Sequence, residues 1–407
     1  MNFKKIKIKF KNNKKTSWIY AILKKIYFFM QKFIISIFCI IFKIMPISPQ
    51  KIVVVNYNGK GYGDNIKYIV KELLKAEKKL DIVWLISNEN KVDEIPSNVR
   101  CIKNESIKAL FELSTAKIWI DNTIKRFKPF KRKKQIYIQT WHAGLGMKKV
   151  GVEVKNCDST YLKQTKDDVN ITDIVISNSD YRSNSFRNSF GYNCEIMKIG
   201  SPRNDILINK INDKEMINEI KTKLNISLER KILMYAPTFR RDSTIEVYNI
   251  NLLETKNNLE EKYGGNWVVL LRLHPYISMF SSDFKENSDS FIDVTNYSDL
   301  SELLLITDFL ISDYSSLIFD YSITKKPALI YAPDLSKYIE QDQLAVPLEE
   351  LPYEIALNNE ELKNHIKNFN NVQYEEKLED YFYRNGLIEN GDASKKICNK
   401  ILEIVGE

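Results

Sequence analysis

Short apolar runs alternate with amphipathic stretches along most of the chain. The apolar runs are rich in Val, Ile, Leu and aromatic residues and end in polar or turn-forming residues, as buried strands of a parallel sheet do. The stretches between them have helical spacing. This alternation predicts an α/β fold built on parallel sheets. The predicted strands cover residues 51–56, 81–87, 99–102, 117–122, 136–141, 172–177, 194–200, 231–240, 267–275, 291–295, 308–312 and 327–332.

The alternation is interrupted once, by a polar helix rich in Lys, Glu and Asn between about residues 209 and 230, and it then restarts. A chain of 407 residues is long enough for two domains with their own cores. We therefore predict two Rossmann-like domains, residues 49–208 and 209–407, preceded by a leader of residues 1–48. Polar helices between residues 359 and 406 end the chain.

The leader combines lysines with apolar residues. Its first 16 residues are rich in Lys and Asn, and residues 17–47 alternate apolar runs with lysines. The longest uncharged run, residues 33–42, is ten residues long, whereas a spanning helix needs about 20. We therefore predict an interfacial helix on an anionic leaflet. A transmembrane anchor and a helix packed on the protein's own core are the alternatives. A signal peptide is disfavoured, because no small-residue cleavage site follows.

The basic excess lies in this leader. The formal net charge is +9, yet no Asp or Glu precedes Asp64, while 13 of the 61 basic residues do. The remaining 48 basic residues face 52 acidic ones, so the body is mildly acidic. This distribution argues against a nucleic-acid partner.

Neither a disulfide scaffold nor a metal site is indicated. The five cysteines are scattered without a C-x-x-C pair, which fits a reducing compartment. The sequence contains no D-x-D or H-E-x-x-H pattern and no His/carboxylate cluster with metal-ligand spacing. We predict no metal and no cofactor.

The stretch from Asp299 to Tyr331 has the order helix, strand, turn, helix, strand. Its strand ends in D-Y-S-S, residues 313–316, which opens directly into a helix. Backbone N–H groups and hydroxyls at the positive end of a helix favour an anion, so we predict a phosphate or pyrophosphate site there. The alternative is that Asp313 or Ser315 only caps the helix.

Other polar clusters also fall directly after predicted strands. In open α/β sheets ligands bind at the carboxyl ends of strands, so two facing domains predict a cleft lined by both edges. The candidate residues at these ends are His142, Arg203, Asn204, Asp205, Thr238, Arg240, Arg272, His274, Asp313, Ser315 and Ser316.

Two histidines are candidates for catalysis. A neutral histidine accepts a proton from an attacking hydroxyl, which suits His142. His274, beside Arg272, suits phosphate binding or protonation of a leaving group. Arginines such as Arg203 and Arg240 match pyrophosphate oxygens. The alternative for the two histidines is a structural role. The alternative for the arginines is an interdomain salt bridge.

Six ordered motifs, within about residues 51–400, resemble the CDP-glycerol glycerophosphotransferase family of teichoic-acid and capsule polymer synthesis. They are Q-T-W-H-A-G-L-G-M-K-K-V-G, G-S-P-R-N-D, M-Y-A-P-T-F-R-R, R-L-H-P, S-D-Y-S-S-L-I-F-D-Y and K-K-P-A-L-I-Y-A-P-D. The early Y-G-D-N and the late N-G-D-A-S-K-K also fit its pattern.

The resemblance implies a GT-B-like fold in which the C-terminal domain binds most of a CDP-alcohol. An acceptor hydroxyl would attack the β-phosphorus, and CMP would leave. His142 would be the base, and His274 would act on the phosphate or leaving group. Arg240, Ser315 and Ser316 would hold the pyrophosphate.

Asp320 would reach the ribose or cytosine. The leader suits a peripheral enzyme at the cytoplasmic face of the membrane, acting on a lipid-linked or polymeric acceptor.

One loop departs from the usual family motif W-H-G-T-P-L-K. Here residues 141–148 read W-H-A-G-L-G-M-K, which leaves glycerol, ribitol or another polyol open, as well as the acceptor and primase or polymerase behaviour. A GT-B glycosyltransferase using a nucleotide sugar is the alternative activity. A membrane-bound scaffold without catalysis is a third alternative.

Overall fold

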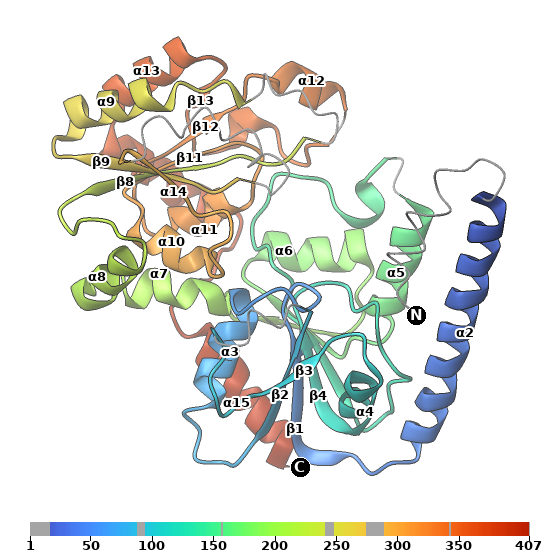
Figure 1. Cartoon of the computed structure of the whole chain (residues 1–407). Helices are drawn as coiled ribbons and strands as arrows, with labels where there is room; N and C mark the ends of the chain where they lie inside the picture. The colour runs from blue at the N-terminus through green and yellow to red at the C-terminus, as the bar shows by residue number, and fades with distance from the viewer. Residues whose placement is uncertain are drawn as a thin grey trace.

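The computed structural model describes residues 17–87, 94–155, 158–240, 248–273, 289–341 and 343–406. Within them the backbone forms two β-sheets flanked by helices (Figure 1). The N-terminal sheet has the strand order β3-β2-β1-β4-β5-β6-β7 and the C-terminal sheet the order β10-β9-β8-β11-β12-β13. Within these two sheets every pairing between described strands is parallel. The predicted α/β fold with two parallel sheets is confirmed.

The N-terminal sheet is apolar on both faces at its centre, because helices cover both sides. Ile52, Val53 and Val54 of β1 are fully buried. Its strands are β1 (Ser48–Val55), β2 (Asp81–Ile86), β3 (Arg100–Lys103), β4 (Ala116–Asp121), β5 (Ile136–Gln139), β6 (Ile174–Ser177) and β7 (Glu195–Lys198). Its helices are α3 (Asp64–Leu73), α4 (Ile107–Thr115), α5 (Ser159–Val169) and α6 (Asp180–Ser185).

The C-terminal sheet has the same construction, with α7 (Asp205–Asn209) and α8 (Lys214–Lys223) leading into it. Strand β13 is only two residues long and has no distinct apolar run, so the sequence pattern did not indicate it. The strands are β8 (Lys231–Ala236), β9 (Trp267–Leu271), β10 (Phe291–Asp293), β11 (Phe309–Ser312), β12 (Ala328–Tyr331) and β13 (Ile355–Ala356). The helices are α9 (Leu252–Tyr263), α10 (Leu300–Ile306), α11 (Leu317–Ser322), α12 (Leu335–Glu340), α13 (Asn359–Asn368) and α14 (Asn371–Arg384).

The last helix returns to the N-terminal sheet. Ile397 and Ile401 of α15 (Ala393–Gly406) pack in the same apolar cluster as Ile66 and Ile69 of α3. Conversely, a residue of the N-terminal half packs on the C-terminal sheet: Leu145, from the loop after β5, lies in the apolar core of that sheet. The two halves therefore exchange segments, and the predicted domain limits stay a prediction.

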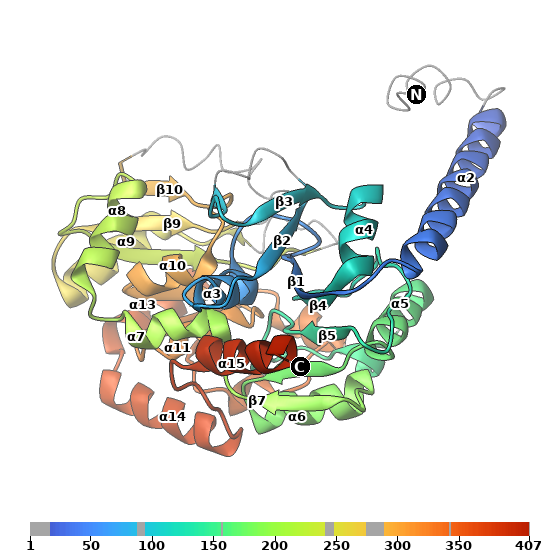
Figure 2. The ribbon, with the colours of Figure 1, turned by 90° about the horizontal axis from the view of Figure 1, so that it is seen from below.

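Helix α2 (Ser17–Lys43) projects from the body of the protein (Figure 2). Phe29, Phe33 and Ile40 on it are 72%, 60% and 63% exposed. Near its C-terminal end the helix contacts the body, where Phe42 packs edge-to-face on Phe111 of α4, at 5.5 Å between ring centroids. Among the described helices none is both long and apolar enough to cross a membrane.

Candidate active site

The imidazole of His142 lies at the carboxyl edge of the N-terminal sheet, just after β5. Its Nδ1 is 2.8 Å from the backbone carbonyl oxygen of Asn122, which follows β4. Since a carbonyl only accepts, Nδ1 carries the hydrogen and Nε2 is left as an acceptor. Burial lowers the pKa of His142 from its usual value, so the ring is neutral near pH 7. This state is the one that a general base needs.

Three non-glycine residues near His142 have a backbone in the left-handed region, with a positive φ. Trp141, directly before it, has φ +50°, and Tyr57 and Asp64 after β1 have φ +43° and +55°. The Tyr57 ring lies 5.3 Å from the His142 ring, between centroids, and the Tyr57 hydroxyl donates to Asp64 at 2.8 Å. Non-glycine residues adopt such φ values at a cost that surrounding contacts must offset, and they concentrate at functional sites.

Three of the predicted residues, Arg203, Asn204 and Asp320, form hydrogen bonds between the two halves of the chain. Arg203 Nη2 donates to Asp320 Oδ2 at 2.8 Å, and Asn204 Nδ2 donates to Asp320 Oδ1 at 3.0 Å. Burial raises the pKa of Asp320 despite the charge of Arg203. Asp205 lies apart from this pair and accepts the backbone N–H groups of Ala393 and Ser394. The contacts that the structure gives for these four residues are with other protein groups. The predicted contacts of the four with substrate stay predictions.

Glu389 accepts hydrogen bonds from three other residues, and the sequence did not indicate it as a site residue. Its Oε1 accepts from Asn178 and Asn204, both at 2.9 Å, and its Oε2 accepts from the backbone N–H of Ser201 at 3.0 Å. Burial raises the pKa of Glu389 to about 7, although these three donors favour the carboxylate. The N-G-D-A-S motif directly after Glu389 was the only feature noted in the sequence analysis that pointed to this segment.

A second cluster forms where β8 and β11 end. Asp313 accepts from the Thr238 backbone N–H at 2.9 Å and pairs with Arg240 Nη1 at 2.9 Å. Arg240 also binds Asp334 through Nε at 2.7 Å. Burial opposes the charge of Arg240, but Asp334 and Asp313 raise its pKa. The cluster brings together three of the candidate residues, Thr238, Arg240 and Asp313, and adds Asp334, which the sequence did not indicate as a site residue.

Asp313 does not cap α11, because its carboxylate faces Thr238 and Arg240. Ser315 Oγ lies 3.5 Å from the backbone nitrogen of Leu317, and Ser316 makes no side-chain capping bond to the helix. Arg272 Nη1 donates to the carbonyls of Thr295 and Tyr297, at 2.8 and 2.7 Å. His274 lies outside the described residues.

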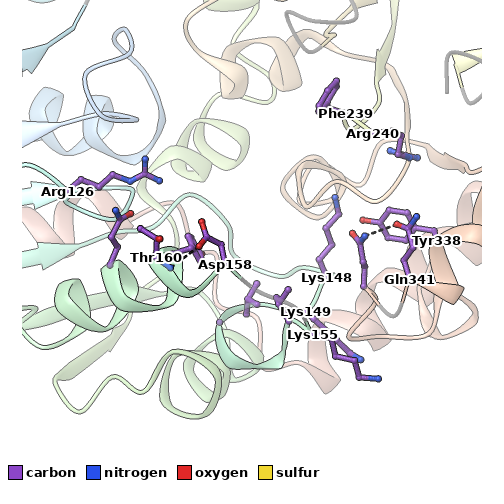
Figure 3. Close-up of a pocket in the computed structure, with 16 residues that line it drawn as sticks. Arg126, Lys148, Lys149, Lys155, Asp158, Thr160, Phe239, Arg240, Tyr338 and Gln341 are labelled. Carbon is purple, nitrogen blue, oxygen red and sulfur yellow. Dashed lines mark hydrogen bonds between the residues drawn. The ribbon is translucent and has the colours of Figure 1, made fainter. Parts of the chain in front are cut away.

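A cavity of about 920 Å³ opens between the two halves. Figure 3 places Lys148, Arg240 and Tyr338 on one wall and Arg126 and Asp158 on the other. The Lys148 ammonium lies 5.7 Å from the centre of the Tyr338 ring, and burial lowers the pKa of Lys148. Lys149 and Lys155 also line the cavity. Among the described residues that line it, the cationic side chains outnumber the single acidic one, Asp158, so the cavity favours an anionic guest.

The loop after His142 is packed tightly between the halves. A Cβ on Gly144 would lie 2.1 Å from Asn178 Nδ2, so a larger residue does not fit there. Arg182 of α6 donates from Nε to the Gly144 carbonyl at 2.6 Å. The sequence pattern placed α6 but did not single out Arg182, because its position next to this loop arises only from the fold.

Comparison with known proteins gives a consistent result. The family model described as CDP-Glycerol:Poly(glycerophosphate) glycerophosphotransferase matches residues 37–403. A teichoic acid poly(glycerol phosphate) polymerase of Staphylococcus epidermidis is 34% identical over 374 residues, covering 89% of this chain. A teichoic acid glycerol-phosphate transferase of Staphylococcus aureus is 32% identical over 377 residues, again covering 89%. The chain spans 52% of the first relative's length and 96% of the second's.

A solved structure has the same fold. It is that of the wall teichoic acid polymerase TagF, as a histidine-to-asparagine variant soaked with CDPG. It is 33% identical, with a TM-score of 0.79, and the match covers 88% of this chain and 90% of that one.

Proposed function

The chain belongs to the CDP-glycerol:poly(glycerophosphate) glycerophosphotransferase family, and from this premise we propose its reaction. It transfers a polyol phosphate, glycerol phosphate or ribitol phosphate, from a CDP-alcohol to a hydroxyl of a lipid-linked or polymeric acceptor. CMP is released. The product belongs to a teichoic-acid-like or capsular polymer.

The observation that carries this proposal is the hydrogen bond from His142 Nδ1 to the Asn122 carbonyl. It directs the basic Nε2 away from Asn122. Nε2 takes the proton of the acceptor hydroxyl while the hydroxyl oxygen forms a bond to the β-phosphorus. The bond from that phosphorus to the oxygen bridging to the α-phosphorus breaks, and the electron pair leaves with CMP. The neutral ring is supported by the burial that lowers its pKa.

We assign the donor to the C-terminal half. Ser315 and Ser316 hold the pyrophosphate, and His274 acts on the phosphate or the leaving group. Arg240 is engaged by Asp313 and Asp334, so in this proposal it fixes the strand-end loops around the donor. Arg272 supports the segment after β10 through the carbonyls that it binds.

We assign the acceptor to the basic cavity. Its walls come from the loop that carries His142, through Lys148, and from the segment after Asn122, through Arg126. An acceptor phosphate lying between these cations would place its terminal hydroxyl near the loop of His142. Lysines and arginines suit a polymer of phosphodiesters.

The membrane contact is assigned to α2, as part of the same proposal. Its exposed apolar side chains suit the interface of a bilayer, and the lysines of the leader suit anionic lipid. The enzyme would then be peripheral, at the cytoplasmic face of the membrane.

A donor screen tests the reaction. The purified chain is incubated with CDP-glycerol, CDP-ribitol and a panel of nucleotide sugars, together with a glycerophosphate acceptor, and the released nucleotide is identified. CMP from one CDP-alcohol supports the proposal and identifies the polyol. Release of UDP or GDP instead would favour the glycosyltransferase alternative.

A further inference from the structure

Arg182 is a buried cation without an anionic partner in the described part of the chain. It is 6% exposed, and its guanidinium carbon lies 5.8 and 5.6 Å from the ring centres of Tyr181 and Phe186. Nε donates to the Gly144 carbonyl. Within the described ranges, Nη1 and Nη2 have no acceptor, and no carboxylate forms an ion pair with the side chain. Burying a cation in this way is unfavourable unless a counter-charge arrives.

The guanidinium lies where the two halves meet. Its Nη2 is 3.2 Å from the point that a Cβ on Gly146 would occupy, and Ser316 Cβ is 4.0 Å from the same point. Arg182 and Ser316 therefore approach Gly146 from different halves of the chain. After burial, the main influence, the charge of Arg182 is among those that lower the pKa of His142, which places Arg182 within electrostatic reach of the proposed base.

Two other arginines at this cleft do have carboxylate partners. Arg203 is paired with Asp320, and Arg240 is paired with Asp313 and Asp334. Their charges are compensated by the protein itself. Arg182 differs from both, because no carboxylate among the described residues forms an ion pair with its guanidinium, although the charges of Glu153 and Asp320 act on it.

We propose that Arg182 binds phosphate oxygens of the CDP-alcohol donor from the N-terminal side, opposite Ser316. The identity of the ligand rests on the proposed function. A guanidinium presents a planar fork that matches two phosphate oxygens. While the acceptor oxygen bonds to the β-phosphorus and CMP leaves, this cation stabilises the negative charge on the transferred group.

The experiment compares Arg182→Gln and Arg182→Lys with a matched control, Arg187→Gln. Arg187 is exposed and lies five residues further along the chain. The full chain is titrated calorimetrically with CDP-glycerol, CDP-ribitol and inorganic diphosphate, and thermal unfolding is followed without ligand. We expect Arg182→Gln to weaken the binding of CDP-alcohol and diphosphate about tenfold or more. Arg182→Lys should lose less, and Arg187→Gln should bind as the unaltered chain does.

Ligand-free unfolding separates a ligand-binding role from a structural one. Removing a buried cation that has no ion pair among the described residues should leave the unfolding midpoint of Arg182→Gln unchanged or raise it. Unaltered affinity in Arg182→Gln would overturn the inference, as would an unaltered chain that binds none of the three probes. A lowered midpoint with equal loss of affinity in Arg182→Lys would also overturn it, because it indicates a purely structural role.

CMP release is measured in parallel. If the unaltered chain binds diphosphate through Arg182 but releases CMP from no CDP-alcohol, the proposed function fails, while Arg182 remains a residue that binds diphosphate. If CMP release is observed and Arg182→Gln binds normally, the inference alone fails.

Discussion

The ammonium of Lys67 on α3 lies 2.5 Å from Oδ2 of Asp299, the residue that caps α10 on the other half of the chain. Glu302 Oε1 is a second partner at 2.6 Å. All three side chains are largely buried. Burial opposes the charge of Lys67, but the two carboxylates raise its pKa. One cation therefore compensates two buried acids at the junction of the halves.

Replacing this lysine is expected to destabilise the protein. Lys67→Met leaves Asp299 and Glu302 buried without a partner, and removing one member of a buried ion pair costs about 3–5 kcal/mol. Lys75→Met is the control, since Lys75 pairs with Glu72 at the surface, where a pair contributes about 0–1 kcal/mol. Urea unfolding of both variants measures the difference. Equal midpoints and slopes for the two would contradict the assignment.

Glu389 should make stability depend on pH. Its pKa is about 7 in the folded chain, above the usual value for Glu, so the folded state holds a proton that the unfolded state has released. The free energy of unfolding therefore falls as pH rises toward 7, and the contribution is fully lost above it. Relative to Glu389→Gln, the unaltered chain should lose about 2 kcal/mol between pH 5 and pH 8. Denaturant unfolding at several pH values tests this, and parallel curves for the two proteins would refute it.

Membrane binding should depend on the apolar face of α2. We expect the triple variant Phe33→Asp, Ile37→Asp and Ile40→Asp to lose binding to vesicles of anionic lipid, because it places charges among exposed apolar side chains. Tyr383→Asp is the control, since Tyr383 is 87% exposed on α14. Co-sedimentation with vesicles measures both. Turnover on a soluble acceptor should survive, and retained vesicle binding by the triple variant would move the contact elsewhere.

The sheets could be predicted from local pattern because a buried parallel strand is an apolar run, such as residues 52–55 in β1. Helix limits were less accurate. The sequence after β1 predicts a helix from about Asp64 to Lys79, but α3 ends at Leu73. Residues 75–79, K-A-E-K-K, offer almost no apolar side chain to bury.

The sequence indicated which polar residues follow the strands, but it did not indicate which of them pair. Arg203 and Asp320 are 117 residues apart, and Arg240 and Asp334 are 94 apart. A local pattern identifies polar strand ends, but the partner of each charge depends on how the two sheets face each other. For the same reason Arg182, next to Gly144 only in space, was not indicated by sequence, and the role of His274 stays a prediction.

His142 gives the sharpest catalytic prediction. Because burial lowers its pKa, the base is neutral down to below the ordinary value of about 6.5. The rate at limiting substrate should therefore rise with pH through that lowered pKa and be level above it. His142→Ala should lose this acidic limb and about 10²- to 10⁴-fold in turnover.

Donor binding separates a base from a ligand-binding residue. Calorimetric titration of His142→Ala with CDP-glycerol or CDP-ribitol should give nearly the affinity of the unaltered chain, because the proposed base contacts the acceptor hydroxyl and the donor is held by the other half. A variant that loses donor affinity as strongly as turnover would show that His142 binds the donor. A variant that keeps its turnover would remove His142 from the mechanism, and the proton would then need another acceptor at this edge of the sheet.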